Sequence, residues 1–437
     1  MPVNPRAAQL QEATCEAITT AVRRYLPAGA YRDFTLWAFS PANPRRQDYL
    51  QVTGLTQLVT MNVTLLSGLV EHDDWADVER YLALMNAYQF FETISDNVAM
   101  GLGSPRLAET GRERLELVTA LNRAMIGALA PGRATPALLL LSGAPRAAAE
   151  RVSAFDQSLA SAKYAGIAEE YARHGAGITS GEIEFGLWGA LVTNVETCRD
   201  IAEAMASRPV GPLLRDGLSS RYRAVDRSLR AASLSRMELA TLGAHSILVM
   251  PTLAYGIGVL ADATTGTDLA GVLADGTLTD VLFDAALLVR LQNDVGTRLL
   301  RMATAQQDAL LHRLARQAAD TGRTTVADAF ALLVEAAVTE VSLTRLEKDI
   351  VNDEFNIALW NARRAGDAAG ALRALGESLA YFAVLYTQHS GRLASGLGWL
   401  DERLGDRRIS TVVERFVRFH ERMYAHRYTE AIGEYAI

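Results

Sequence analysis

The sequence predicts an all-α protein, and three observations carry this prediction. Hydrophobic residues make up 49% and charged residues 21% of the 437 residues, a composition typical of a folded chain. Apolar positions recur at spacings of three and four in many windows, whereas alternating runs of β-branched residues are short. The sequence has no Gly/Ser-rich or Pro-rich linker long enough to separate domains. We therefore expect a single large helical domain over residues 1–437.

Each expected helix is an apolar-periodic run that ends in a cluster of turn-forming residues. Such clusters of Gly, Pro, Asp, Ser and Thr occur at 41–46, 101–105, 131–136, 264–277 and 365–368. Residues 1–48 are expected to form an N-terminal segment that caps the bundle. The expected helical runs are 50–70, 78–91, 112–129, 154–174, 185–206, 222–242, 280–306, 326–348, 368–388 and 409–428.

Charge and cysteine content exclude several classes of function. The net charge of −7 argues against a nucleic-acid partner, because phosphate binding needs a basic surface. Arginines are dense between Arg208 and Arg236, but interrupting acids favour a solvated helix face there. Two cysteines, Cys15 and Cys198, are too few for a disulfide framework or a zinc cluster, and the N-terminus lacks the apolar core of a signal peptide. A cytoplasmic location is expected.

The apolar run at residues 239–261 is the one segment that resembles a membrane span. It contains no formally charged residue, but it does contain His245, Pro251 and three glycines. We expect a buried, broken helix there and no membrane span.

A polar cluster emerges from the apolar run that precedes Arg290. Asn293, Asp294 and Thr297 carry oxygen ligands of the kind that Mg²⁺ prefers, and on a helix Asn293 and Thr297 share one face. This segment resembles the second metal motif of class I terpene synthases, Asn-Asp-x-x-Ser/Thr-x-x-x-Glu. At the position of the final Glu this sequence has Arg301.

An aromatic helix upstream ends in two acids, Glu92 and Asp96, spaced at i and i+4. Acids at the C-terminal end of a helix oppose its dipole unless a cation compensates them. The segment resembles the first, aspartate-rich motif of class I terpene synthases, with Thr93 in place of the second acid. A solvated helix end is the alternative reading.

A second acidic set, Asp73, Asp74 and Asp77, satisfies the pattern Asp-Asp-x-x-Asp outright. Because it precedes a helical run, we favour capping of that helix for these residues. The aromatic residues beside Glu92 include Tyr88 and Phe91, whose rings would stabilise a carbocation, although aromatic residues at helical spacing also build ordinary cores.

Weaker similarities to the same family follow in chain order. The segment Phe39-Ser-Pro-Ala-Asn-Pro44 resembles an N-terminal segment of bacterial terpene synthases, and residues 239–261 resemble the kinked helix that points backbone carbonyls into the pocket. In the family's Arg-x-x-Thr-x-Gly frame the arginine position is Glu238, with Arg236 two residues away. Arg427 and Tyr428 resemble the terminal Arg-Tyr pair, whose arginine binds diphosphate.

The resemblance implies a cyclase that ionises a linear prenyl diphosphate of C15 or C20 length with Mg²⁺ and closes the carbocation into rings. A homodimer would be unsurprising for this family. The implied roles are metal ligands Glu92, Asp96, Asn293 and Thr297, diphosphate ligands Arg236, Arg427 and Tyr428, and catalytic residues Tyr88, Phe91 and Arg301.

Two other classes of function stay open. One is a helical metal oxygenase, since Glu170 and His174 lie about one helical turn apart and His389, His420 and His426 are further imidazoles. The other is a catalytically inactive helical protein that binds an isoprenoid, which Arg301 and the missing arginine at position 238 favour.

Overall fold

The computed structural model describes residues 4–132, 135–142, 149, 159–184, 186–262 and 269–426, and Arg427 and Tyr428 lie outside these ranges. Within these ranges the regular structure is helical and contains no β-strand, which confirms the all-α prediction. The helices are α1 (Pro5–Tyr25), α2 (Ala30–Ala38), α3 (Arg46–Val52), α4 (Leu55–Leu66), α5 (Trp75–Asn97), α6 (Glu109–Ala128), α7 (Ala137–Leu140), α9 (Leu159–Tyr171), η1 (Ala172–Ala176), α10 (Ser180–Glu184), α11 (Leu187–Ala204), α12 (Gly211–Arg230), α13 (Arg236–Ser246), α14 (Val249–Asp262), α15 (Leu269–Ala274), α16 (Thr277–Val295), α17 (Thr297–Leu300), α18 (Thr304–Asp320), α19 (Val326–Ala337), η2 (Val341–Leu343), α20 (Thr344–Val351), η3 (Ala362–Arg364), α21 (Ala368–Leu404) and α22 (Arg408–Met423).

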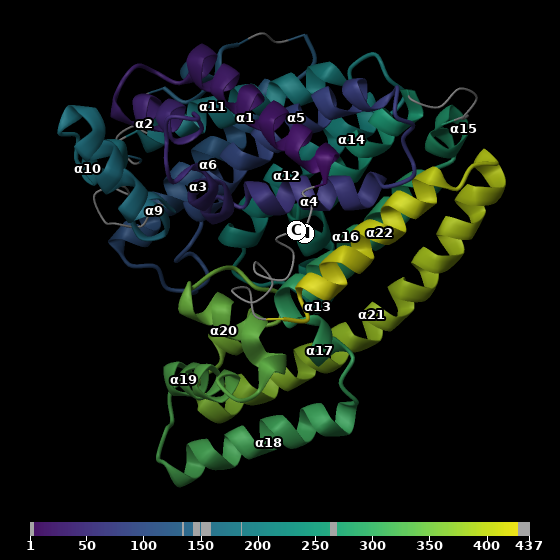
Figure 1. The fold of residues 1–437 in the computed structure, drawn as a ribbon. Helices are drawn as coiled ribbons and strands as arrows, with labels where there is room; N and C mark the ends of the chain where they lie inside the picture. The colour runs from purple at the N-terminus through teal and green to yellow at the C-terminus, as the bar shows by residue number, and fades with distance from the viewer. Residues whose placement is uncertain are drawn as a thin grey trace.

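The helices form a broad upper body and a narrower lower part (Figure 1). In the upper body α5 lies between α1 and α11, and α12 packs against α6, α13 and α14. The lower part contains α18, α19 and α20. The long helix α21 packs against α16 in the upper body and against α18 and α19 in the lower part, and so connects the two.

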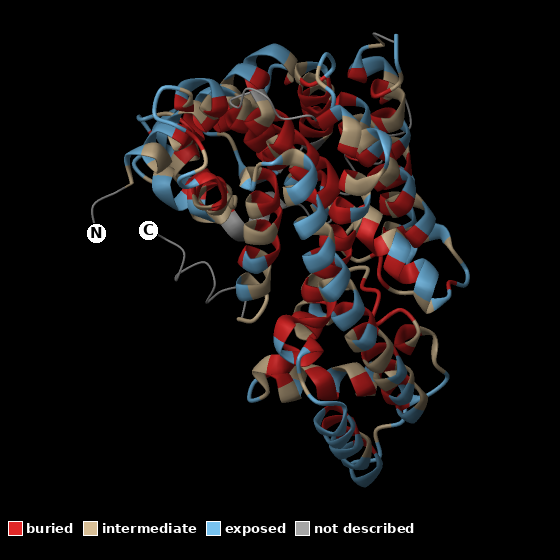
Figure 2. Ribbon diagram, turned by 90° about the vertical axis from the view of Figure 1, so that its right-hand side faces the viewer, coloured by how far each residue is buried: buried red, intermediate tan, exposed pale blue. Residues whose placement is uncertain are grey.

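The central helix of the molecule is α16. Almost every residue from Leu278 to Val295 is buried, and α13, α14, α21 and α22 all pack against this helix. A helix that is buried on nearly all sides is stable only inside a protein, and the polar residues of α16 that are buried include the ion-paired Asp284 and Asp294. One continuous apolar core therefore runs through the upper body, where buried residues are concentrated (Figure 2).

A second, smaller core joins the N-terminal helices to α5 and α9. Aromatic rings dominate it: Phe34 packs edge-on to Tyr49 at 5.7 Å between ring centroids and stacks on Tyr164 at 5.6 Å. Phe90 and Phe91 of α5 belong to the same core. Because α1 and α2 contribute to this core, residues 4–48 cover one side of α5.

Four of the expected helical runs are interrupted. The run at 50–70 is divided between α3, which ends at Val52, and α4, which begins at Leu55. The run at 222–242 is wrong as a single helix, because α12 ends at Arg230 and Ser235 caps a new helix, α13. The run at 280–306 breaks at Gly296, whose φ of 91° favours glycine. The run at 326–348 is split between α19 and α20. In each case apolar periodicity continues across a break that packing imposes.

The expected broken helix at residues 239–261 is confirmed. Helix α13 ends at Ser246, Ile247 is extended, and α14 begins at Val249. Two segments, Arg236–Ala261 and Ala368–Leu404, are long and apolar enough to cross a membrane by length and composition alone. In the first, 67% of the most apolar stretch is buried, as expected of a core helix.

Candidate functional site

A buried ion pair between α5 and α12 forms the centre of the candidate site. Glu92 accepts hydrogen bonds on Oε1 from Nε of Arg221 at 2.8 Å and from Nη2 at 2.5 Å. Its other oxygen, Oε2, accepts from Asn194 Nδ2 and from Tyr222 OH, both at 3.0 Å. Nη1 of Arg221 donates to the carbonyl of Ser246, the last residue of α13. One guanidinium group thus joins the acid of α5 to the break between α13 and α14.

Two tyrosines extend this network into the core. The Tyr222 hydroxyl donates its hydrogen bond to Glu92. Tyr88 must therefore be the donor in the 2.7 Å hydrogen bond between the two phenol oxygens. Both tyrosines are buried, and burial raises the pKa of each phenol well above its usual value. Cys198 lies beneath Tyr222, and burial raises the pKa of its thiol. The two phenols and the thiol in this network therefore stay neutral.

Asp96 lies one turn beyond Glu92 and differs from it in accessibility. The Asp96 side chain is 70% exposed, and its Oδ1 lies 3.5 Å from Nη2 of Arg221. Desolvation by the surrounding protein nevertheless raises its pKa, while the positive charge of Arg221 opposes this shift. Two further charges act on the pKa of Asp96: Glu354, just after α20, raises it, and Lys348, on α20, lowers it. Asp96 is thus the solvent-facing edge of a network that is otherwise buried.

The C-terminal end of α16 carries a second buried ion pair. Asp294 is fully buried, and its Oδ2 lies 2.7 Å from Nη2 of Arg290 and accepts from the backbone N–H of Ile357 at 2.9 Å. Asn356 donates to the Asp294 carbonyl at 2.8 Å. Burial raises the pKa of the Asp294 carboxyl, and Arg290 opposes this shift. Asp294 therefore anchors the loop after α20 to α16.

Asn293 and Thr297 do not share a helix face, which corrects the expectation from their spacing. Helix α16 ends at Val295, and Gly296 turns the chain before α17 begins at Thr297. The Asn293 amide oxygen accepts from Nη2 of Arg345 at 2.5 Å. The Thr297 hydroxyl donates to the carbonyl of Glu421 at 2.7 Å. The two side chains are directed to different partners.

The ends of α5 and α16 both contact the segment from α20 to η3. The loop after α5 is bonded to the end of α20, because Gly101 N–H donates to the Asn352 carbonyl at 3.1 Å and Gly103 N–H to the Asp353 carbonyl at 2.7 Å. Asp353 has a φ of 46°, an uncommon conformation for a residue other than glycine. The same segment supplies the partners of Asn293 and Asp294 described above. The two candidate motifs are therefore linked through α20.

The side chains proposed as magnesium ligands do not form a magnesium site as they lie. Both oxygens of Glu92 are occupied by donors, Asn293 is bonded to a guanidinium group, and Thr297 is bonded to a carbonyl. Only Asp96 presents an exposed carboxylate. Across the part of the chain that the structure describes, no group of three or more His, Cys, Asp or Glu side chains could hold a metal ion. Guanidinium groups occupy the positions where a cation was expected.

The aromatic residues expected to face a carbocation are core residues. Tyr88 and Phe91 are both 0% exposed. Phe91 packs edge-on to Phe90 at 4.9 Å, inside the small core shared with the N-terminal helices. These contacts support the alternative that the two aromatic residues belong to the hydrophobic core.

The two described arginines among the expected site residues pair with acids elsewhere. Arg301 forms an ion pair with Glu421 of α22. Arg236 lies at the first position of α13 and pairs with Glu377 of α21 at 2.6 Å. Both arginines therefore pair with acids outside the network around Arg221.

The acidic set Asp73, Asp74 and Asp77 lies at the start of α5, as expected of helix-start residues. Asp74 occupies the N-cap position and Asp77 the first turn, although the Asp74 side chain makes no capping hydrogen bond. Negative charge in this first turn complements the helix dipole.

The residues of the oxygenase reading are dispersed. His174 is exposed in the middle of η1, with its ring 6.0 Å from that of Trp37. His389 pairs with Asp284 at 2.6 Å, between α21 and α16. His420 packs on Phe416 in α22. These imidazoles pack on different elements, consistent with the metal-site result above.

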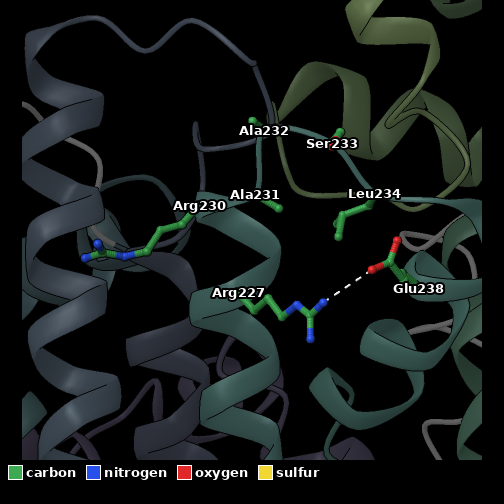
Figure 3. Close-up of a pocket in the computed structure, with 7 residues that line it drawn as sticks. All are labelled: Arg227, Arg230, Ala231, Ala232, Ser233, Leu234 and Glu238. Carbon is green, nitrogen blue, oxygen red and sulfur yellow. Dashed lines mark hydrogen bonds and ion pairs between the residues drawn. The ribbon is translucent and has the colours of Figure 1, made fainter.

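A pocket of about 340 Å³ lies where α12 ends and α13 begins (Figure 3). Arg227 points across it toward Glu238, at 3.3 Å, and Arg230 points away from Glu238. The other lining residues are Ala231, Ala232, Ser233 and Leu234. Its charges are already paired, and none of the expected site residues lines it.

The arginines that organise the site were not predicted from the sequence. Arg221 was included in a basic stretch assigned to a solvated face, and this assignment is wrong for that residue, which is 7% exposed. A signal was present: Leu214, Leu218 and Val225 share the helix face of Arg221 at spacings of three, four and seven. A cation on an apolar helix face predicts a buried ion pair.

Comparison of the chain with models of protein families, with curated proteins and with solved structures gave no match. The fold and the site define an all-α protein with two buried arginine–carboxylate pairs at the ends of α5 and α16.

Proposed function

We propose that the protein binds a linear prenyl diphosphate of C15 or C20 length and acts as a class I terpene synthase-like cyclase. One observation carries the proposal. Arg221 connects Glu92 and Asp96, the acids of the first motif, to the carbonyl at the α13–α14 break. The resemblance in the sequence concerns the same acids and the same broken helix.

Arg221 is the group best suited to the diphosphate. A guanidinium group binds phosphate oxygens in a bidentate manner and keeps its charge when buried. Burial alone would lower its pKa, but the negative charges of Glu92 and Asp96 keep the pKa above its usual value. A diphosphate that enters beside the exposed Asp96 would compete for Nη2, which lies 3.5 Å from that carboxylate.

The reaction begins with heterolysis of the allylic C–O bond. The electron pair leaves with the diphosphate, and the charge that develops on this group is stabilised by fixed cations in a site that water cannot enter freely. Arg221 supplies one such cation, and Lys348 lies close enough to Asp96 to affect its charge. Mg²⁺ belongs to the family resemblance, but three of its four expected ligands, Glu92, Asn293 and Thr297, are already bonded within the protein.

A second candidate is an isoprenoid-binding protein without turnover. The observation that favours it is the complete pairing of the two buried acids, Glu92 with Arg221 and Asp294 with Arg290. A site that is satisfied in this way binds an anion only by rearranging its own ion pairs.

The experiment is incubation of the purified protein with C10, C15 and C20 prenyl diphosphates, with Mg²⁺ and with EDTA. Products are identified by gas chromatography and mass spectrometry, and diphosphate release is measured in parallel. The test variant combines Glu92→Gln with Arg221→Gln, which keeps the buried groups neutral and able to form hydrogen bonds. We expect product formation to fall about a hundredfold, as for loss of one group that stabilises developing negative charge. Arg227→Gln, an exposed arginine on the same helix, is the matched control.

The outcomes separate the two candidates. Cyclic products in either buffer support the cyclase, and the EDTA arm shows whether the arginines suffice. Calorimetric binding of a thiolodiphosphate analogue without product formation supports the second candidate. Full product formation by the double variant would refute the role of Arg221, and a chain that neither binds nor converts any of the three substrates would refute both functions.

A further inference from the structure

The C-terminal end of α22 is fastened to α17. The Thr297 hydroxyl donates to the Glu421 carbonyl at 2.7 Å, and the Thr297 N–H donates to the Tyr424 carbonyl at 3.3 Å. Nε of Arg298 donates to the Ala425 carbonyl at 2.6 Å. Carbonyls in the last turn of a helix have no partner within the helix. Residues of α17 therefore satisfy the end of α22.

An ion pair adds to these backbone contacts. The guanidinium group of Arg301 binds Oε1 of Glu421, and Tyr386 OH donates to the same oxygen at 2.9 Å. Arg298 and Arg301 also lie at the negative end of the α22 dipole, which favours cations. Glu421 thus accepts from α21 and from Arg301 at once.

The fastened end of α22 supports the candidate site through Tyr424. The Arg345 guanidinium lies over the Tyr424 ring, with Cζ 4.7 Å from the ring centroid. Arg345 in turn donates from Nε to the Asn293 carbonyl at 2.8 Å and from Nη2 to the Asn293 amide oxygen. A chain of contacts therefore runs from Arg301 through Glu421 and Tyr424 to Arg345 and Asn293.

We propose that Arg301 is a positioning residue: through Glu421 it holds the end of α22 so that Tyr424 supports Arg345, and Arg345 orients Asn293 at the end of α16, which the segment after α20 links to the end of α5. This role replaces the catalytic role that the family resemblance implied for Arg301. The inference rests on the proposed function for its effect on substrate binding. The effect of the Arg301–Glu421 ion pair on the end of α22 can be measured without substrate.

The experiment is a charge exchange with Arg301→Glu, Glu421→Arg and the double variant. Each single change places like charges together, and we expect the KM for the prenyl diphosphate to rise about fivefold with kcat little changed. The double variant should restore the KM, because the pair reforms with its charges exchanged. Arg301→Lys should also preserve most of the affinity. If Arg301 instead contacts diphosphate, the double variant will stay impaired, because residue 301 is then acidic.

Hydrogen exchange provides the readout that does not depend on activity. The N–H of Tyr424 donates to the His420 carbonyl at 2.8 Å, and its exchange should accelerate in each single variant and return in the double variant. Charge exchange of Arg313 and Glu340, an exposed ion pair at 2.6 Å elsewhere in the fold, is the matched control. Unchanged exchange at Tyr424 in both single variants would overturn the proposal that the Arg301–Glu421 ion pair holds the end of α22. If exchange is restored in the double variant but the unmodified protein forms no product, the ion pair holds the end of α22 and the cyclase function is rejected.

Discussion

Arg221 and Glu92 are both less than a tenth exposed, and they pair at 2.5 Å between α12 and α5. Four donor atoms converge on the Glu92 carboxylate: two nitrogens of one guanidinium group, an amide nitrogen and a phenol oxygen. A buried carboxylate is tolerated when it is paired and hydrogen-bonded in this way. The pair therefore fixes how α5, α11 and α12 meet.

Removal of one member of this pair should destabilise the protein strongly. Arg221→Met leaves the Glu92 charge buried without its partner, and we expect a loss of about 3–5 kcal/mol in the free energy of unfolding. Arg227→Met on the same helix breaks an exposed ion pair and should change stability by less than about 1 kcal/mol. Denaturant unfolding of both variants measures the contrast. Equal effects would show that the buried pair contributes no more than a surface contact.

Gly243 of α13 allows the Arg290 side chain to approach the helix closely. A Cβ at this position would lie 2.9 Å from Arg290 Cγ and 3.3 Å from Ile357 Cγ2. Gly243→Ala should therefore destabilise the protein by about 1–3 kcal/mol through overpacking. Gly256→Ala in α14 is the control, because nothing lies within 4 Å of its Cβ. That change should stabilise the protein by about 0.5–1 kcal/mol, since alanine favours helices. Thermal unfolding distinguishes the two signs.

Gly296 is expected to resist replacement for a different reason. Its φ of 91° and ψ of 137° suit only glycine, and a Cβ would lie 3.1 Å from Arg345 Cγ. We expect Gly296→Ala to lower the unfolding free energy by about 1–3 kcal/mol. Gly276→Asn provides the comparison, because that position is left-handed with open space around it and asparagine tolerates this conformation. A loss in Gly276→Asn as large as in Gly296→Ala would contradict this account.

His420 should make stability depend on pH. Its ring packs among Phe416, Phe419 and Tyr424, and burial lowers its pKa to about 4, although its bond to the Phe416 carbonyl opposes the shift. As pH falls below the usual value near 6.5, the unfolded chain takes up a proton that the folded chain does not bind. Stability should therefore fall by about 2 kcal/mol between about pH 7.5 and about pH 5.

The variant His420→Phe should remove this part of the pH dependence. Unfolding by urea at the two pH values, with the exposed His312→Gln as a control, measures the difference. An unchanged slope in His420→Phe would assign the pH dependence to other groups.

The helices were predictable where one apolar stripe sets their length. The expected run 112–129 lies close to α6, and the run 409–428 begins one residue after the start of α22 but extends beyond the end of that helix at Met423. A single face of each helix packs on the core. The N-terminal helices were not among the expected runs, although α1 has clear signals in its Asn4 cap and the Pro at its start. The break at Gly296 was hidden because buried residues continue on both sides of it.

The site was predictable only in part. The sequence singled out Glu92, Asp96 and Asp294, and each of them proves to contact a buried arginine. It did not identify Arg221 as the partner of Glu92 or Arg345 as the partner of Asn293, because pairing between residues more than a hundred, or about fifty, positions apart depends on how helices pack. A local pattern identifies which groups carry charge, and only the fold decides which charge neutralises which.

The burial of α16 has a consequence for how the chain is made. This helix is covered on one side by α21 and α22, which begin more than seventy residues after it ends. At a synthesis rate of about 5–20 residues per second, the ribosome needs about ten seconds to deliver that cover. During this interval the growing polypeptide exposes the apolar surface of α16. Chaperones that bind nascent chains should therefore increase the yield of folded protein in cells.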